Sequence, residues 1–223
     1  MNIGPADHRP RSFKDLIGVS RRIGEMLQKK CERAEGPLKV LLYGAPGTGK
    51  TELIKMSAVQ LTGLPLDKSG NSFATESVNG KNVNSEMIRR WMEGLAYRPM
   101  YRFEVKLVNE IDRMHPDSQV LILDYLDAMG EGRAFFATSN LELNQLTERF
   151  ETRLQQFRVS SPAAEEIAGF LVTHWRIGKA RAMEIASGAR GNVRAACLDC
   201  QSVLDVERIN GKHRNVAVPK PAL

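Results

Sequence analysis

The stretch Gly44-Ala45-Pro46-Gly47-Thr48-Gly49-Lys50-Thr51 decides the fold. It matches the phosphate-binding pattern G-x-x-x-x-G-K-[ST], in which glycines let backbone N–H groups curl around a row of phosphates. In this pattern the lysine reaches the β- and γ-phosphates, and the hydroxyl of the last residue binds Mg²⁺. We therefore predict that all eight residues bind ATP, with Lys50 on the phosphates and Thr51 on Mg²⁺.

The surroundings of this loop are those that the pattern requires. Residues 39–43 form a short apolar run, which indicates a buried strand before the loop. Residues 51–62 follow with apolar side chains at helical spacing, so a helix N-terminus adds its partial positive charge at the phosphates. A glycine-rich turn without a ligand is the alternative, and it requires that motif and context coincide by accident.

Apolar runs alternate with segments of helical period throughout residues 1–160, and this alternation predicts a parallel sheet covered by helices. Near-continuous hydrophobicity indicates strands that are buried on both faces. The predicted strands are residues 39–43, 73–78, 103–109, 133–139 and 155–159. The predicted helices are residues 51–62, 85–96 and 116–129. The fold class is therefore α/β, a P-loop core with a parallel five-stranded sheet flanked by helices.

Strand signals stop at Pro162, and only helical patterns follow. They cover residues 163–176, 179–186 and 192–208, with glycines between them. Residues 210–223 lack any period and are predicted to be a flexible basic tail. We expect a nucleotide-binding domain at 1–160, an all-helical lid domain at 161–209 and the tail at 210–223.

Polar residues end the predicted strand 103–109, where chemistry beside a P-loop usually lies. Glu110 is predicted to be the general base that orients and polarises the attacking water. Asn109 occupies the position where Asp normally assists Mg²⁺, directly or through water. Losses of this kind typically weaken activity about 10- to 100-fold, so we predict retained ATP binding and slow turnover. The alternative is that Glu110 is a solvated carboxylate at a strand end.

Composition restricts the class of protein. The net charge of +6 and the pI near 9.3 are compatible with an anionic partner, although many basic proteins bind no nucleic acid. No apolar run approaches the roughly 20 residues of a membrane span, and residues 1–7 do not resemble a secretory signal, so we expect a cytoplasmic protein. Cys197 and Cys200 lie on one predicted helix and are expected to pack in its core; a zinc site would need two further ligands.

Taken in order, the motifs resemble those of the clamp-loader branch of the AAA+ ATPases, and most of all the small subunits of replication factor C, from Arg9 to about Leu204. The resemblance implies that the stretch 9–18 packs against adenine, through Arg9, Pro10, Ile17 and Gly18. It implies that Asn140 is the sensor 1 residue that helps to hold the attacking water. Arg153, in Thr152-Arg153-Leu154, is the expected arginine finger toward a neighbouring subunit, and Arg194 is the expected sensor 2 residue.

The same resemblance implies a ring of AAA+ subunits, homo- or hetero-oligomeric, that acts on DNA and on a protein such as a sliding clamp or a helicase. By position, the DNA contacts would be Lys81, Asn82, Arg89 and Arg90. Contacts of this kind bind phosphates without reading sequence, so binding should weaken steeply with salt. A polar loop that leads into a solvated helix face is the plainer interpretation of these residues.

The sequence departs from the family at Asn109 and Leu154, which stand for Asp and Cys, and it ends soon after the lid, before the helical collar of clamp loaders. Initiator and helicase-loader ATPases share most of these motifs. Two further alternatives are a nucleotide-responsive scaffold with negligible hydrolysis and an RNA- or transposition-linked regulator.

Overall fold

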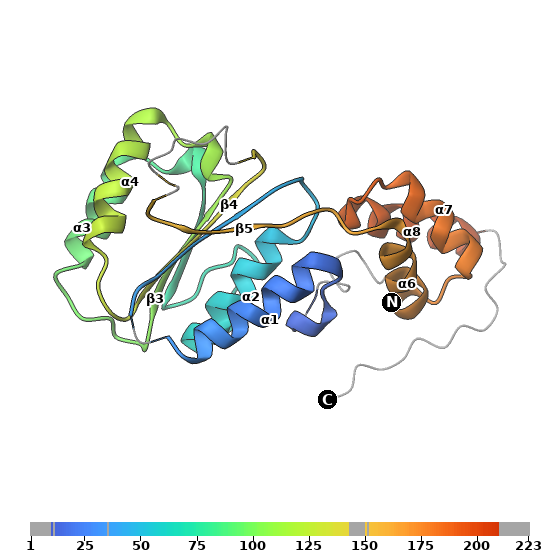
Figure 1. Ribbon diagram of the computed structural model, residues 1–223, viewed down its shortest axis with the longest axis horizontal. Coiled ribbons are helices and arrows are strands. Elements are labelled where there is room, and N and C mark those ends of the chain that lie inside the picture. The colour runs from blue at the N-terminus through green and yellow to red at the C-terminus, as the bar shows by residue number, and fades with distance from the viewer. Residues whose placement is uncertain (1–9, 11, 35, 143–149, 151, 210–223) are drawn as a thin grey trace.

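The computed structural model describes residues 10, 12–34, 36–142, 150 and 152–209 (Figure 1). Arg9 and the tail predicted at 210–223 lie outside the described residues. Five parallel strands form one sheet in the order β2-β3-β4-β1-β5. Their bounds are Leu38–Tyr43 (β1), Thr75–Asn79 (β2), Glu104–Asn109 (β3), Arg133–Ser139 (β4) and Gln155–Arg158 (β5). The predicted fold class is confirmed.

The register of the sheet brings the carboxyl ends of the strands to one edge. Asn79 pairs with Asn109 where β2 and β3 end, and Tyr43 pairs with both Ser139 and Arg158. β1 lies between β4 and β5, so the chain after β1 crosses to the far side of the sheet before it returns. Ligands of open parallel sheets bind in the crevice outside the strand ends at such a reversal, and the loop after Tyr43 lies there.

Helices cover both faces of the sheet. On one face α1 (Gly18–Glu32) and α2 (Lys50–Thr62) pack in a cluster with the side chains of β1. On the other face α3 (Ser85–Gly94) and α4 (Pro116–Ala128) form a second cluster (Figure 1). The predicted helices at 51–62, 85–96 and 116–129 are confirmed, with ends that differ by up to two residues. Helix α1 was not predicted.

Two apolar residues lie outside the core that the sequence predicts for them. The predicted strand 73–78 begins only at Thr75, and Phe73 is 92% exposed. Ser72 and Thr75 exchange backbone hydrogen bonds of 2.9 and 3.3 Å, and the tight turn between them carries Phe73 outward. Val120, an apolar residue of the predicted helix 116–129, is half exposed, because α4 packs through Ile122 and Leu126 instead.

A charged cluster lies between α3 and the sheet. Lys106, in the middle of β3, is 8% exposed and forms ion pairs of 2.9 Å with Glu76 and with Glu104. The indole Nε1 of Trp91 on α3 donates to Glu76 at 2.8 Å, and the Lys106 ammonium lies 5.5 Å from the centre of its ring. Since a buried ammonium is costly without partners, these contacts satisfy Lys106 and attach α3 to β2.

The C-terminal helices α6 (Ala164–Trp175), α7 (Lys179–Gly188) and α8 (Val193–Ile209), here called the lid, enclose a core of their own (Figure 1). Cys200 is fully buried in it, and burial raises the pKa of the partly buried Cys197 thiol to about 11. Both cysteines therefore pack in the core as expected.

None of the described helices is long and apolar enough to cross a membrane.

Candidate nucleotide-binding site

The loop between β1 and α2 has the backbone of a phosphate cradle. Gly44, Gly47 and Gly49 have φ angles of 128°, 76° and 94°, in the region that favours glycine. The Thr48 hydroxyl donates to the Ala45 carbonyl at 3.0 Å, which closes the loop on itself. From α1, the buried Ser20 hydroxyl donates to the Thr48 carbonyl at 2.6 Å. The helix that the sequence analysis missed therefore fixes the shape of the loop.

Lys50 lies folded into this loop. Its ammonium donates to the carbonyls of Gly44 and Ala45 at 2.7 Å each, and the residue is 5% exposed. Burial, with a smaller contribution from the positive charge of Arg194, lowers the pKa of Lys50 to about 8, although the nearby carboxylates Asp112 and Glu110 partly counteract these effects. The ammonium thus lacks a full counter-charge, which a triphosphate would supply.

This pKa gives ATP binding a pH dependence. Phosphates bind the protonated lysine and raise its pKa, so affinity should be constant below about pH 8 and should fall up to about tenfold per unit above it. Calorimetric titration with Mg·ATP between pH 7 and 9.5 measures this decline. A Lys50→Arg variant, whose guanidinium stays charged throughout, is the control and should show no decline. Parent affinity that stays level to pH 9.5 would contradict the assignment.

Glu110 faces the loop from the end of β3. Its backbone is left-handed, with φ of 55°, and its N–H donates to the Thr138 hydroxyl at 3.0 Å. Its carboxylate accepts from the Asn79 amide at 3.0 Å, from Arg113 at 3.1 Å and from the Asn140 amide at 3.4 Å. The hydrogen bond from Asn79, followed by the charge of Arg113, holds the pKa of Glu110 below its usual value. A carboxylate here is ionised at neutral pH, as a general base must be.

The structure places Asn140 beside both acidic residues of this edge. Its backbone N–H donates to Asp112 at 3.2 Å, while its amide reaches Glu110. The predicted base and the predicted sensor 1 residue are therefore neighbours, although they come from the ends of β3 and β4.

Asn109 carries an unsatisfied oxygen. Its Oδ1 is buried and has no hydrogen-bond partner among the described residues. Buried polar atoms without partners are rare, and an amide oxygen suits Mg²⁺ or a water that the ion holds. Together with the cradle and the hydroxyl of Thr51 at the start of α2, this donor set fits Mg·ATP.

Asn79 is a residue of this site that the sequence analysis assigned to a different one. It lies just before the predicted DNA contacts Lys81 and Asn82, yet its side chain donates to Glu110 while it accepts from the Lys81 backbone N–H at 3.2 Å. A side chain at the Cβ position of Gly80 would collide with the Glu110 backbone, so this turn and Glu110 are in direct contact. The pairing of β2 with β3, which no local sequence pattern specifies, is what brings Asn79 to Glu110.

The lid touches the phosphate loop directly. The Val193 backbone N–H donates to the Gly47 carbonyl at 3.1 Å, and any Cβ on Gly47 would collide with the side chain of Asn192. Arg194, the next residue of α8, is exposed and lies close enough to lower the pKa of Lys50. The predicted sensor 2 residue is therefore at the nucleotide site.

The predicted adenine contacts lie where α1 meets the lid. Ile17 packs against the lid core, and Gly18, with φ of 57°, lies against Pro162 and Glu166. Pro10 is partly buried, and Arg9 lies outside the described residues.

Arg153 lies at the other end of the sheet. Arg153 precedes β5, whose first residue Gln155 pairs with Val40. It therefore lies near the starts of the strands, whereas the phosphate loop follows their ends. Its Nε donates to both carboxylate oxygens of Asp127 at 2.9 and 2.8 Å, and its NH2 lies 2.8 Å from Oδ2. Arg153 is thus on a different part of the surface from the nucleotide site of its own chain.

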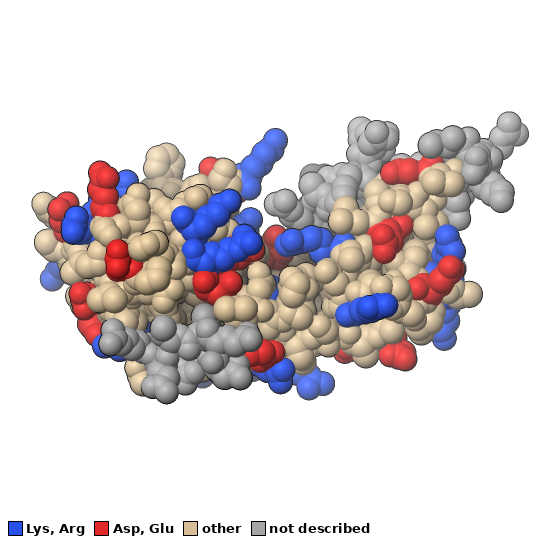
Figure 2. Space-filling model, turned by 90° about the horizontal axis from the view of Figure 1, so that it is seen from above, with Lys and Arg blue, Asp and Glu red and all other residues tan. Residues whose placement is uncertain are grey.

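The predicted DNA contacts are all exposed. Lys81 and Asn82 belong to the 3-10 turn η3 (Gly80–Asn82), and Arg89 and Arg90 lie on α3. Arg90 is engaged within the chain, because it forms an ion pair of 2.6 Å with Glu76. Seen from above, a group of Lys and Arg side chains lies over the α/β part of the molecule (Figure 2).

Residues 40–172 match the family described as "ATPase family associated with various cellular activities (AAA)". Replication factor C subunit 4 of Arabidopsis thaliana is 26% identical over 175 residues, which cover 75% of this chain and 50% of the plant protein. Replication factor C subunit 5 of Homo sapiens is 29% identical over 154 residues, 68% of this chain and 44% of the human protein.

Solved structures with this fold include a RuvB variant from Thermotoga maritima, with a TM-score of 0.71 and 19% identity over 92% of this chain and 68% of that one. A DNA polymerase III gamma subunit-related protein from the same organism has a TM-score of 0.52 and 18% identity, over 75% and 60%. The chain spans about half the length of the replication factor C subunits. Because the family match covers more than half of the sequence and includes the phosphate loop and Glu110, the chain belongs to the AAA family of ATPases.

Proposed function

We propose that this chain is an ATP-hydrolysing subunit of an oligomer that acts on DNA in the manner of a clamp loader. Residues 1–160 are its nucleotide-binding domain and residues 161–209 its lid. One observation carries the proposal: the ionised Glu110 and Asn140 meet beside the phosphate loop, while Arg153 lies at the opposite end of the same sheet. A single chain thus carries one part of a hydrolysis site at each end.

The residues at the phosphate loop have separate tasks. Lys50 neutralises the β- and γ-phosphates, and Arg194 adds positive charge from the lid. Asn140 orients a water that Glu110 polarises for attack on the γ-phosphate. When bound, Mg²⁺ supplies further charge neutralisation, and Thr51 and Asn109 are the residues that would hold it.

Arg153 completes the site of a neighbouring subunit. Phosphoryl transfer develops charge on the transferred group, and an arginine supplied by another chain stabilises it. Because Arg153 is far along the sheet from its own phosphate loop, association of subunits is what brings a guanidinium to the nucleotide. Hydrolysis should therefore be weak in a monomer.

Asn109 makes the proposed enzyme slow rather than inactive. The family position normally holds a carboxylate, and an amide leaves the cation with one negative charge less nearby. Its buried oxygen still points to a ligand, since no described residue satisfies it. We infer that ATP binding is retained while turnover is reduced about 10- to 100-fold.

The proposed action on DNA is supported by the similarity to replication factor C subunits. Replication factor C subunits are similar to this chain over 68–75% of its length, and the exposed Lys81, Asn82, Arg89 and Arg90 are the proposed phosphate contacts. Other AAA+ subunits, and a protein such as a sliding clamp or a helicase, are the proposed partners.

The test is ATP turnover across a range of protein concentrations, with and without primed DNA. The proposal expects the rate per subunit to rise with concentration, as subunits supply Arg153 to one another, and to rise again with DNA. A nucleotide-responsive scaffold, which Asn109 favours as the second candidate, would instead assemble with ATP and show no turnover above background. A rate per subunit that is independent of concentration and DNA would contradict the proposal.

A further inference from the structure

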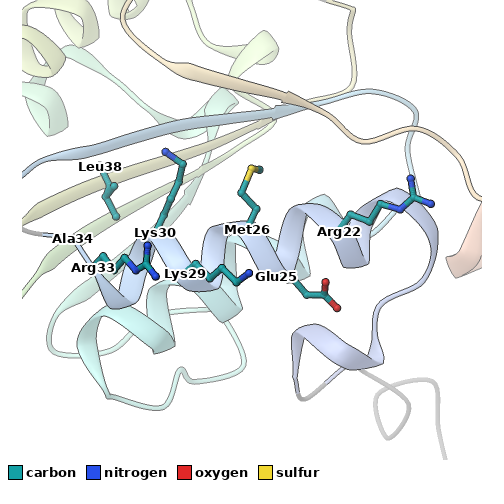
Figure 3. A pocket seen from close by; sticks show the side chains of 8 residues that line it. All are labelled: Arg22, Glu25, Met26, Lys29, Lys30, Arg33, Ala34 and Leu38. Carbon is teal, nitrogen blue, oxygen red and sulfur yellow. The ribbon is translucent and has the colours of Figure 1, made fainter.

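A basic groove lies along α1, and at its Arg22 end it adjoins the pocket that Ile17 and Gly18 line. The groove has a volume of about 550 Å³, and the side chains of Met26 and Leu38 form its apolar floor. Figure 3 shows Arg22, Met26 and Lys30 projecting from one side of α1 toward the neighbouring strands. Four cations line it: Arg22, Lys29, Lys30 and Arg33. They are separated by up to 11 residues, or about 16 Å of helix.

These four cations have no acidic partners within the described part of the chain. No described carboxylate lies within ion-pair distance of any of them. The only acid in the lining, Glu25, is paired with Arg21 at 3.3 Å. Among its described lining residues the groove therefore carries four positive charges and one negative charge.

Helix stability explains only part of this pattern. Lys29 and Lys30 lie in the last turn of α1, where a cation interacts favourably with the helix dipole. Arg22 lies in the second turn from the opposite end, where the dipole gives a cation no stabilisation, and the first turn contains no acidic residue. A row of cations that extends beyond the stabilising end of a helix points to an anionic partner rather than to helix stability.

The residues that line the groove indicate which class of anion it binds. Proteins that hold single-stranded nucleic acid use aromatic side chains as stacking platforms, and this groove has none. A straight row of flexible cations on a rigid helix instead matches a rigid rod of charge, and duplex DNA carries one charge per about 1.7 Å of its axis. We propose that the α1 groove binds the phosphodiester backbone of duplex DNA, independent of sequence.

The groove is separate from the contacts proposed on α3. Helix α1 packs on one face of the sheet with β1, and α3 packs on the opposite face. A duplex on α1 therefore needs no contact with Arg89 or Arg90. The inference rests on the proposed action on DNA, to which it adds a second site, and does not depend on ATP turnover.

The test is fluorescence anisotropy of a labelled 20-base-pair duplex, without nucleotide, between 50 and 200 mM KCl. The variant is Arg22→Gln/Lys29→Gln/Arg33→Gln, in which all three altered residues are exposed. Each phosphate contact contributes about 0.9 to the slope of log affinity against log salt, so the variant should lose about 2.7 from the slope. Raising KCl from 50 to 200 mM should therefore weaken duplex binding by the parent about 40-fold more than it weakens binding by the variant.

The matched control is Lys68→Gln/Arg98→Gln/Lys179→Gln, which removes the same charge from exposed residues elsewhere. It should keep the parent slope, and thermal denaturation should show both triple variants folded. Equal slopes for the parent and the groove variant would overturn the inference. The inference would also be overturned if a single strand bound as tightly as the duplex. Tighter binding of poly-L-glutamate than of the duplex would overturn it too, and would assign the groove to an acidic protein.

Two further outcomes distinguish a failure of this inference from a failure of the proposed function. If only an Arg89→Gln/Arg90→Gln variant loses duplex affinity, the action on DNA stands and the groove is overturned. If the parent binds no duplex at 50 mM KCl, both fail, whereas ATP turnover measured without DNA still tests the hydrolytic site.

Discussion

Replacing Arg153 with alanine is expected to slow ATP hydrolysis by about 10³-fold or more and to leave ATP affinity unchanged. The reason is the position of the residue: Arg153 lies near the strand starts, so it makes no contribution to the phosphate loop of its own chain. Steady-state turnover at a protein concentration that saturates assembly measures the loss, and calorimetry measures the affinity.

Arg158→Ala is the charge-matched control: Arg158 is an exposed arginine at the opposite end of β5 from Arg153, and it is paired with Glu142 at 3.0 Å. It should retain parent turnover. A mixing experiment then tests whether Arg153 acts between chains. Combining Arg153→Ala with Glu110→Gln places an intact finger beside an intact base at some interfaces, so the mixture should hydrolyse ATP although neither variant does alone. A mixture as inactive as its components would mean that Arg153 acts elsewhere.

Glu110→Gln is expected to abolish hydrolysis, with a loss of about 10²- to 10⁴-fold, while Mg·ATP still binds. The carboxylate is held ionised by Asn79 and Arg113, and glutamine keeps the size and one acceptor oxygen for these two donors but cannot accept the proton of a water. Single-turnover hydrolysis of bound ATP measures the chemical step.

Glu93→Gln, an exposed glutamate on α3, is the control and should behave as the parent. If Glu110→Gln hydrolyses ATP as fast as the parent, Glu110 has no part in the reaction. If it instead fails to bind ATP, the carboxylate is a structural partner of Asn79 and Arg113.

The fold was predictable because its main signals are local. The phosphate loop is contiguous in sequence, and the strands beside it are apolar runs that are buried on both faces, as β4 is along its whole length. Helix α1 was not predicted although Ile23, Leu27 and Cys31 recur at helical spacing and are buried, so its signal was present in the sequence. Phe73 was misplaced because an aromatic next to a strand looks the same in sequence whether it enters the core or lies on a tight turn.

The candidate site was predictable only in part, because its members are brought together by tertiary structure. Glu110 and Asn140 could be expected from their motifs, but the hydrogen bond between Asn79 and Glu110 joins residues 31 positions apart through the register of β2 and β3. No local pattern specifies that contact. Likewise the ion pair of Arg153 with Asp127 depends on how the end of α4 packs beside the chain that enters β5.

The contact between Gly47 and the lid has a consequence for protein engineering. Gly47 must be glycine for its backbone angle, and also because Asn192 occupies the space where any side chain would begin. The Val193 backbone N–H of α8 also donates a hydrogen bond to the Gly47 carbonyl. A lid taken from a homologue would have to reproduce this fit against Gly47. In a chimaera the phosphate loop and the lid should therefore come from the same protein.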